Sequence, residues 1–103
     1  MTIKENKIDT ALAYVLSKAK LVKKNPKTIV LEYEWNNKIG VETLGKYKDS
    51  SSYFTSATSI LPNGKKWYSY SSYIERDVKT NFNLTYSECT ELNEKLYFHF
   101  RNN

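Results

Sequence analysis

The sequence predicts an α+β domain in which a helix, four or five antiparallel strands and a second helix follow one another along the chain. Apolar residues recur at helical spacing near both ends of the chain, and alternating apolar and polar residues fill the segments between. Asn-Asn and Asn-Gly pairs separate those segments at hairpin spacing. The expected architecture is one antiparallel sheet with helices on one face, in a single domain over residues 1–103.

The amino-terminal helix is expected from one apolar stripe that repeats every three or four residues: Ile8, Leu12, Val15, Ala19 and Val22. Pro26 is expected to stop this helix, because proline disfavours helical backbone in the residue before it. Beside the stripe, one flank of the helix holds four lysines, which we call the lysine flank: Lys20, Lys23, Lys24 and Lys27. The flank has two interpretations, a solvated helix end with charges that suit the helix dipole, or a surface that binds anions.

The first hairpin is predicted from the alternating segment TIVLEYEW, whose apolar side chains share one face: Ile29, Leu31, Tyr33 and Trp35. A two-residue loop at Asn36-Asn37 would mix apolar and polar residues on both faces. A three-residue loop over residues 36–38 instead pairs Trp35 with Ile39. Because register follows the hydrophobic face, we expect the three-residue loop, which sets Glu32 opposite Glu42 on the outer face.

The second hairpin is predicted at Asn63-Gly64, the strongest short turn signal in the chain. This turn pairs Ile60 with Trp67 and continues the second strand through PNGKKWYSYSSYIERD (residues 62–77), which we call the ribbon. Its apolar inner row is expected to meet the core together with the strand before it: Tyr53, Thr55, Ala57, Ser59, Leu61, Tyr68, Tyr70 and Ile74. The outer row pairs Thr58 with Ser69, Ser56 with Ser71, and Phe54 with Tyr73.

The carboxyl-terminal part is expected to hold a short fifth strand, VKTNFNL, and then a helix over TYSECTELNEKLYFHF. Thr85 and Glu88 have the spacing of a capping box at the start of this helix. Its apolar stripe comprises Cys89, Leu92, Leu96 and Phe100.

Positive charge is concentrated at the amino-terminal end of this chain, whose net charge is +5. Residues 1–27 carry seven lysines against Glu5 and Asp9, whereas residues 28–103 carry nine basic and nine acidic residues. A localised basic segment is typical of a surface that binds a polyanion. Nucleic acid is therefore the expected partner.

The ribbon and its neighbours have the residue types of a platform on which nucleic-acid bases stack, because basic side chains lie close to aromatic ones there. The residues concerned are Phe54, Lys65, Lys66, Trp67, Tyr73 and Arg76. Two alternatives remain open. The same residues suit ordinary cross-strand pairing, and Tyr, Ser and Trp also suit an adaptable protein interface.

The stretch NGKKWYSYSSYIERDVKTNFNLTYSECTELNEKL resembles the small arm-binding domains of phage and transposon integrases, which combine a three-stranded sheet with a helix. The resemblance covers residues 56–96. It implies that the sheet face with Trp67, Ser69 and Ser71 enters a DNA groove. The sequence departs from that pattern in its third strand, which is not basic, and in its helix, which carries Glu88, Glu91 and Glu94.

No residue pattern indicates catalysis, a metal site or a cofactor. Cys89 and His99, each the only residue of its type, are ten positions apart and would lie on different faces of one helix. A single cysteine allows no internal disulfide, and no segment has the apolar run of a signal peptide or a membrane span. We therefore expect a soluble cytoplasmic protein with no membrane partner.

The expected function is that of a small non-enzymatic binding protein, of the kind that phages and mobile elements encode. It would contact nucleic acid through the lysine flank and the ribbon. The alternative is a protein-binding inhibitor or adaptor of a host or defence protein that uses the ribbon as its interface.

Overall fold

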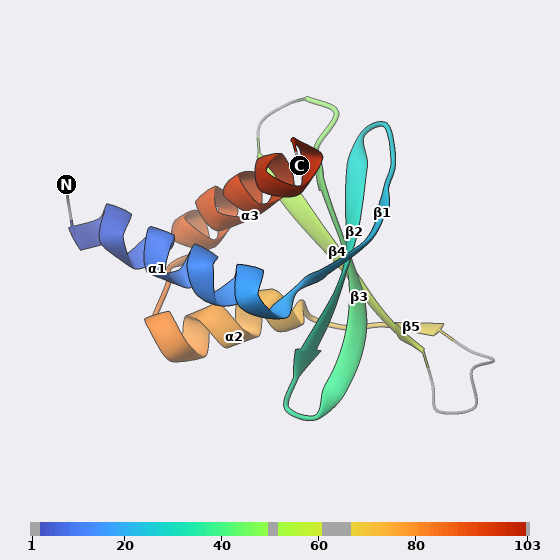
Figure 1. The fold of residues 1–103 in the computed structure, drawn as a ribbon, viewed down its shortest axis with the longest axis horizontal. Helices are drawn as coiled ribbons and strands as arrows, with labels where there is room; N and C mark the ends of the chain where they lie inside the picture. The colour runs from blue at the N-terminus through green and yellow to red at the C-terminus, as the bar shows by residue number, and fades with distance from the viewer. Residues whose placement is uncertain (1–2, 50–51, 61–66, 103) are drawn as a thin grey trace.

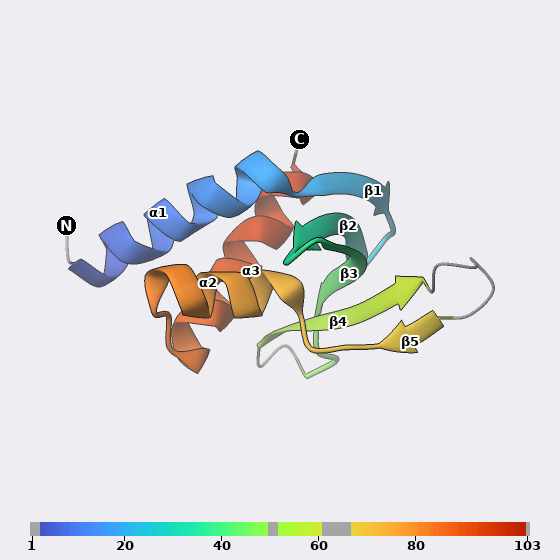
Figure 2. The same cartoon turned by 90° about the horizontal axis from the view of Figure 1, so that it is seen from below.

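A computed structural model describes residues 3–49, 52–60 and 67–102, with the backbone alone for residues 3–6, 59–60 and 67–68. The elements are α1 (Ile3–Lys18), β1 (Lys20–Lys24), β2 (Thr28–Trp35), β3 (Lys38–Lys46), β4 (Tyr53–Ile60), β5 (Trp67–Ser69), α2 (Tyr73–Phe82) and α3 (Tyr86–Arg101). The strands form one antiparallel sheet in the order β1-β2-β3-β4-β5. All three helices lie on the same side of it (Figure 1, Figure 2). The predicted α+β class is confirmed, with α2 as an additional helix.

The core lies between the helices and the inner face of the sheet. The inward residues of β2 are fully buried, as the alternation predicted: Ile29, Leu31 and Tyr33. The helices contribute the facing apolar stripes, whose buried members are Ile8, Ala11, Val15, Ile74, Val78, Cys89, Leu92 and Leu96. Removing this apolar surface from water is the main force that holds the helices on the sheet.

The amino-terminal helix is shorter than the apolar stripe predicted. It ends at Lys18, and the next residues form β1, which pairs with β2 through Leu21 and Leu31. Val22, expected in the core, is 57% exposed. Pro26 belongs to a tight turn instead of a helix end, because the Asn25 amide donates to the Thr28 carbonyl across it. Backbone pairing with β2 therefore replaces the last helical turn, and the lysine flank is not helical.

The β2–β3 loop has two residues, so the predicted three-residue loop is wrong. Asn36 and Asn37 both have positive φ, 54° and 62°, as a tight type I′ hairpin turn requires. Trp35 therefore pairs with Lys38, and Leu31 pairs with Glu42. Asparagine tolerates this left-handed conformation better than most residues. The turn thus sets a register that places Glu42 on the inner face.

Buried Glu42 has a structural role that explains why a carboxylate is tolerated there. It is fully buried and accepts hydrogen bonds at the start of α2, from the Ser72 hydroxyl at 2.6 Å and the Tyr73 amide at 2.7 Å. The Tyr70 hydroxyl adds a third bond, at 3.0 Å. Burial raises the pKa of the Glu42 carboxyl, and these donors oppose the rise. The carboxylate satisfies amides that a helix start leaves without partners.

The ribbon is not one long strand. The expected pairs of Ile60 with Trp67 and of Thr58 with Ser69 are present, but β5 ends at Ser69. The chain then enters α2, so Phe54 does not pair with Tyr73, and the expected fifth strand over residues 78–84 is wrong. The predicted Asn63-Gly64 turn lies outside the described residues.

Local helix signals explain why α2 forms. The Ser72 hydroxyl accepts from the Glu75 amide at the first turn, and Asn83 ends the helix in the left-handed conformation. Because Val78 to Phe82 belong to α2, the third strand of the integrase arm-binding domains is not present in this part of the described chain. The final helix agrees with the prediction: Thr85 and Glu88 form a capping box.

A buried polar cluster around Asp77 of α2 ties α1 and α2 to the sheet. The Asp77 carboxylate accepts from Lys18 Nζ at 2.8 Å, from the Tyr33 hydroxyl at 2.6 Å and from the Tyr14 hydroxyl at 3.1 Å. Asn81 Nδ2 adds a fourth bond at 2.6 Å. Burial acts to raise the pKa of the Asp77 carboxyl, but the donors outweigh burial and hold that pKa below its usual value.

Candidate nucleic-acid interface

The residues of the lysine flank remain close together, although they lie on a strand and a turn. Lys20, Lys23 and Lys24 are exposed on β1, which forms one edge of the sheet. Lys27 lies in the turn between β1 and β2. Lysines along an exposed sheet edge also discourage pairing with other strands. The flank is therefore a basic edge that leads into a basic turn.

That turn borders a hollow of about 300 Å³. It is lined by Pro26 and by basic and aromatic residues from three separate segments: Lys27, Lys46, Tyr47, Lys48 and Tyr97. The β1–β2 turn, the end of β3 and the carboxyl end of α3 all lie at the same end of the sheet (Figure 1). We call this set of residues the basic end. The sequence had pointed to Lys27 alone among its members.

Bonds from α3 fix the shape of the basic end. The Tyr97 hydroxyl donates to the Lys27 carbonyl at 3.2 Å. Arg101 Nη2 donates to the carbonyls of Asn25 and Thr28 and stacks its guanidinium over the Tyr97 ring at 5.2 Å. Lys24 Nζ donates to the Arg101 carbonyl at 3.4 Å. The turn is therefore held in place before any ligand binds, which lowers the entropic cost of binding.

The cations of the basic end have no acidic partner in the described part of the chain. No carboxylate there lies within ion-pair distance of Lys27, Lys46 or Lys48. Lys46 Nζ lies over the Tyr53 ring, 5.0 Å from its centroid. Tyr47 is 51% exposed, which leaves an aromatic surface open beside three uncompensated positive charges. Positive charges of this kind attract a polyanion, and an exposed aromatic ring offers a face on which a base can stack.

The other predicted site residues do not form one surface. Phe54 lies on the outer face as expected, half-buried, with its ring 5.3 Å from that of Tyr47. Arg76 is exposed on α2 with its guanidinium over the Trp35 ring at 5.7 Å. Tyr73, predicted to face a partner, is 3% exposed and belongs to the core, because it starts α2 instead of continuing β5. The Trp67 side chain, Lys65 and Lys66 lie outside what is described.

A signal for the missed residues was present in the sequence. Lys46, Tyr47 and Lys48 form a basic-aromatic triplet at the end of the segment KIGVETLGKYK, where the chain enters a loop, and loops often carry binding residues. Tyr97 and Arg101 are four residues apart and so share one helix face. Nothing in the sequence showed that this face meets the β1–β2 turn.

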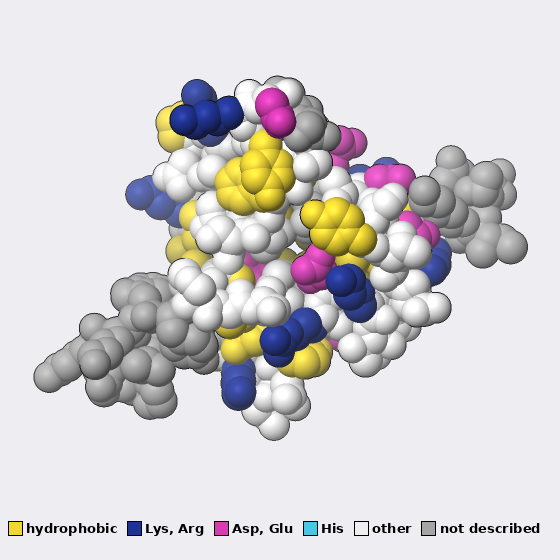
Figure 3. Space-filling view, turned by 180° about the vertical axis from the view of Figure 1, so that it is seen from behind, with side chains coloured by type: hydrophobic (Ala, Val, Ile, Leu, Met, Phe, Trp, Pro, Cys, Tyr) yellow, Lys and Arg dark blue, Asp and Glu magenta, His cyan; other side chains and the backbone are white. Residues whose placement is uncertain are grey.

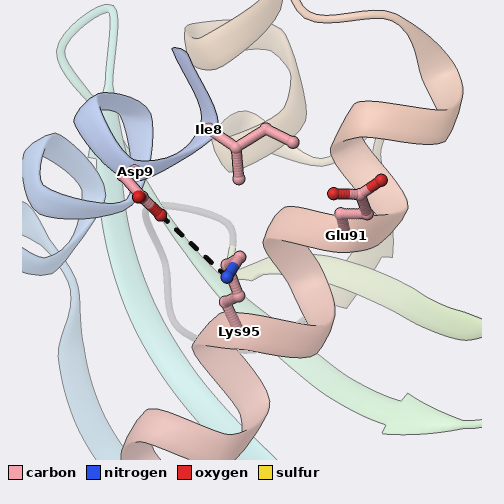
Figure 4. A pocket seen from close by; sticks show the side chains of 4 residues that line it. All are labelled: Ile8, Asp9, Glu91 and Lys95. Atoms are coloured by element: carbon pink, nitrogen blue, oxygen red, sulfur yellow. Dashed lines mark ion pairs between the residues drawn. The ribbon is translucent and has the colours of Figure 1, made fainter. Parts of the chain in front are cut away.

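A second hollow, of about 350 Å³, lies between α1 and α3 and is lined by Ile8, Asp9, Glu91 and Lys95 (Figure 4). Asp9 and Lys95 approach to 4.0 Å, and their side chains are about half exposed. Exposed pairs of this kind contribute little energy. The charges of this hollow are mixed, so it offers no preference for a polyanion.

The described residues contain no group of three or more metal-ligating side chains. Cys89 is buried, and burial raises the pKa of its thiol to about 11, so it is not poised as a nucleophile. Within the described ranges, no helix is both long enough and apolar enough to span a membrane. No protein-family model, curated protein or solved structure matches the chain.

Proposed function

We propose that the protein binds single-stranded nucleic acid at the basic end, without catalysing a reaction on it. The lysines contact backbone phosphates, and Tyr47 stacks on a base. The edge lysines of β1 extend the path of the strand away from the hollow. Binding of this kind follows backbone charge and base stacking more than base sequence.

The observation that carries the proposal is the convergence of Lys27, Lys46 and Lys48 around one hollow with two tyrosines. These lysines come from segments about twenty residues apart in the chain. No described carboxylate neutralises them, and hydrogen bonds from α3 hold the turn that carries Lys27. A merely solvated surface would not need this fixed arrangement.

The expected energies are sufficient for binding. Stacking on Tyr47 is worth about 1–3 kcal/mol per base. Each phosphate contact adds a counterion-release contribution that falls as salt rises. Three such contacts and one stack are consistent with micromolar affinity at low salt.

The test is a fluorescence anisotropy titration with a labelled oligo-dT and a labelled oligo-U. A variant with Lys27, Lys46 and Lys48 changed to Gln should lose most of the affinity and keep the wild-type melting temperature. A control with Lys38, Lys79 and Lys95 changed to Gln removes the same charge elsewhere and should bind nearly as well as wild type. Equal losses in the two variants would reject the basic end as the site.

A Tyr47→Ala variant separates stacking from charge, because it removes the ring and leaves every lysine in place. Its affinity should fall by about tenfold, which corresponds to about 1.4 kcal/mol. The alternative of a protein partner makes a different prediction. In that case neither oligonucleotide binds, and capture of a protein from host extract survives nuclease treatment.

A further inference from the structure

A third hollow, of about 140 Å³, lies at the open edge of β4, beside α2 and α3. The residues that line it include Tyr47, Phe54, Thr55, Glu75 and Tyr86. On the face of the molecule shown in Figure 3, apolar side chains lie around a hollow with an acidic side chain next to it. The charge of this hollow is opposite in sign to that of the basic end, because its charged residue is a carboxylate.

The aromatic walls are accessible to a ligand. Tyr86 is 74% exposed at the start of α3, and Tyr47 is 51% exposed. The rings of Tyr47 and Phe54 lie 5.3 Å apart at an interplanar angle of 49°. Tyr53 also lines the hollow, but Lys46 Nζ already lies over its ring. Of the other three rings, Tyr86 is the most exposed, and an exposed aromatic face attracts a cation.

Two polar groups of the hollow lack a partner in the described structure: the Glu75 carboxylate has no ion pair, and the Thr55 hydroxyl has no hydrogen bond. In the described structure, no cation lies within 4.0 Å of the Glu75 carboxylate. The Thr55 hydroxyl is buried and makes no hydrogen bond to the described protein. Buried hydroxyls nearly always have a partner, and leaving one unpaired carries a cost that a ligand would recover. Both groups accept hydrogen bonds, so both suit a donor ligand.

The strand beside the hollow also has unpaired backbone. The Tyr70 amide donates to the Ala57 carbonyl, so the backbone groups of Ala57 point toward β5. Backbone groups alternate between the two edges of a strand, so those of Thr55 point to the same edge. β5 pairs only with residues 58–60 and does not reach Thr55. An extended peptide could therefore bond to this part of β4.

We propose that this hollow binds an alkylammonium or guanidinium group, with the cation between the aromatic rings and the Glu75 carboxylate. The Thr55 hydroxyl accepts one of its N–H bonds. An anion would be repelled by Glu75, and a neutral apolar group would leave the carboxylate and the hydroxyl unpaired. The cation comes either from a free amine or from a lysine or arginine of another protein. Tyr47 lines both this hollow and the basic end, so the two sites share one aromatic residue, whereas Glu75 and Tyr86 line this hollow alone.

The test is an NMR titration of the ¹⁵N-labelled protein with N-acetyl-arginine amide, with the neutral isostere N-acetyl-citrulline amide as the ligand control. Arginine amide should shift the amides of Thr55, Glu75 and Tyr86 with millimolar affinity, and citrulline amide should not. Glu75→Gln should lower the affinity for N-acetyl-arginine amide by at least about tenfold, or about 1.4 kcal/mol. Glu91→Gln, which removes a carboxylate outside this hollow, is the matched control and should bind as wild type does.

Tyr86→Ala tests the aromatic wall without risk to the core, because this ring is mostly exposed. It should weaken binding by about threefold or more through the lost cation–π contact. Equal chemical-shift changes with the arginine and the citrulline ligand, or an unchanged affinity in Glu75→Gln, would overturn the proposal. A pentapeptide with a central arginine distinguishes the two sources. Tighter binding of the peptide than of the amide indicates a protein side chain with help from the β4 backbone, and equal binding indicates a free cation.

Discussion

The Asp77 cluster makes a strong prediction, because every side chain around the carboxylate donates to it. Asp77→Asn keeps the shape of the side chain and removes its charge. In the wild-type protein, the Asp77 carboxylate accepts hydrogen bonds from an ammonium, two hydroxyls and a side-chain amide. The new NH₂ group would face the same donors. The two tyrosine hydroxyls and the Asn81 amide can turn to accept from it, but the Lys18 ammonium cannot. The substitution also leaves Lys18 without its partner.

The size of the effect follows from burial. Removing one partner of a fully buried ion pair costs about 3–5 kcal/mol. The Lys18 side chain keeps 30% of its exposure, so its ammonium can regain some water and the cost is reduced. We expect Asp77→Asn to lower the free energy of unfolding by about 2–3 kcal/mol. For a domain of this size, that loss corresponds to a fall in melting temperature of about 10–20 °C.

Calorimetry and urea denaturation at several pH values measure this effect. The pKa of Asp77 is lower in the folded protein than in the unfolded chain. Its stabilising contribution is therefore complete above the unfolded pKa and is lost as the pH falls through the folded pKa. Wild type should lose stability in acid more steeply than Asp77→Asn, so the two should converge as the pH falls below the folded pKa of Asp77. A loss under about 1 kcal/mol at neutral pH, or parallel pH profiles, would refute the assigned role of the cluster.

Three further substitutions test the register and the ribbon. Glu42→Leu should lower the free energy of unfolding in urea by about 2–4 kcal/mol, because it leaves buried donors at the start of α2 unpaired. A neutral or stabilising effect would instead indicate that residue 42 lies on the outer face. Asn37→Gly should stabilise the protein by about 0.5 kcal/mol, since its φ is 62°, and a destabilisation would contradict the two-residue turn. Trp67→Ala should weaken partner binding by about 2 kcal/mol at an unchanged melting temperature if this residue contacts the partner, and a stability loss of about 3–5 kcal/mol would instead place it in the core.

The fold class was predictable because its signals are local and repeat along the chain. The alternation in β2 and the capping box at Thr85 each involve residues close in sequence, and both are confirmed. The same kind of signal marked α2, where Ser72 and Glu75 have the spacing that identified the final helix. This helix-start signal was outweighed by the expectation that one strand continues from the Asn63-Gly64 turn through residue 77. The evidence for α2 was therefore present in the sequence.

Glu42 could not be placed from the hydrophobic pattern, because that pattern assigns a glutamate to solvent. Its burial depends on a helix start about thirty residues further along the chain, which supplies the donors. Similarly, the lysine flank was assigned to a helix because apolar spacing continued through Val22. Pairing with β2 is a tertiary effect that local spacing does not contain. The basic end was hidden for the same reason, since it joins the β1–β2 turn, the end of β3 and α3.

The salt dependence of oligonucleotide affinity tests the central proposal most directly, because it counts the phosphates that the protein neutralises. For a single strand, the logarithm of affinity falls against the logarithm of salt with a slope of about −0.7 per phosphate contact. Changing Lys27, Lys46 and Lys48 to Gln should make this slope shallower by about 2, whereas the control at Lys38, Lys79 and Lys95 should leave it nearly unchanged. A slope that is the same in both variants, or an affinity that does not respond to salt, would contradict nucleic-acid binding at the basic end.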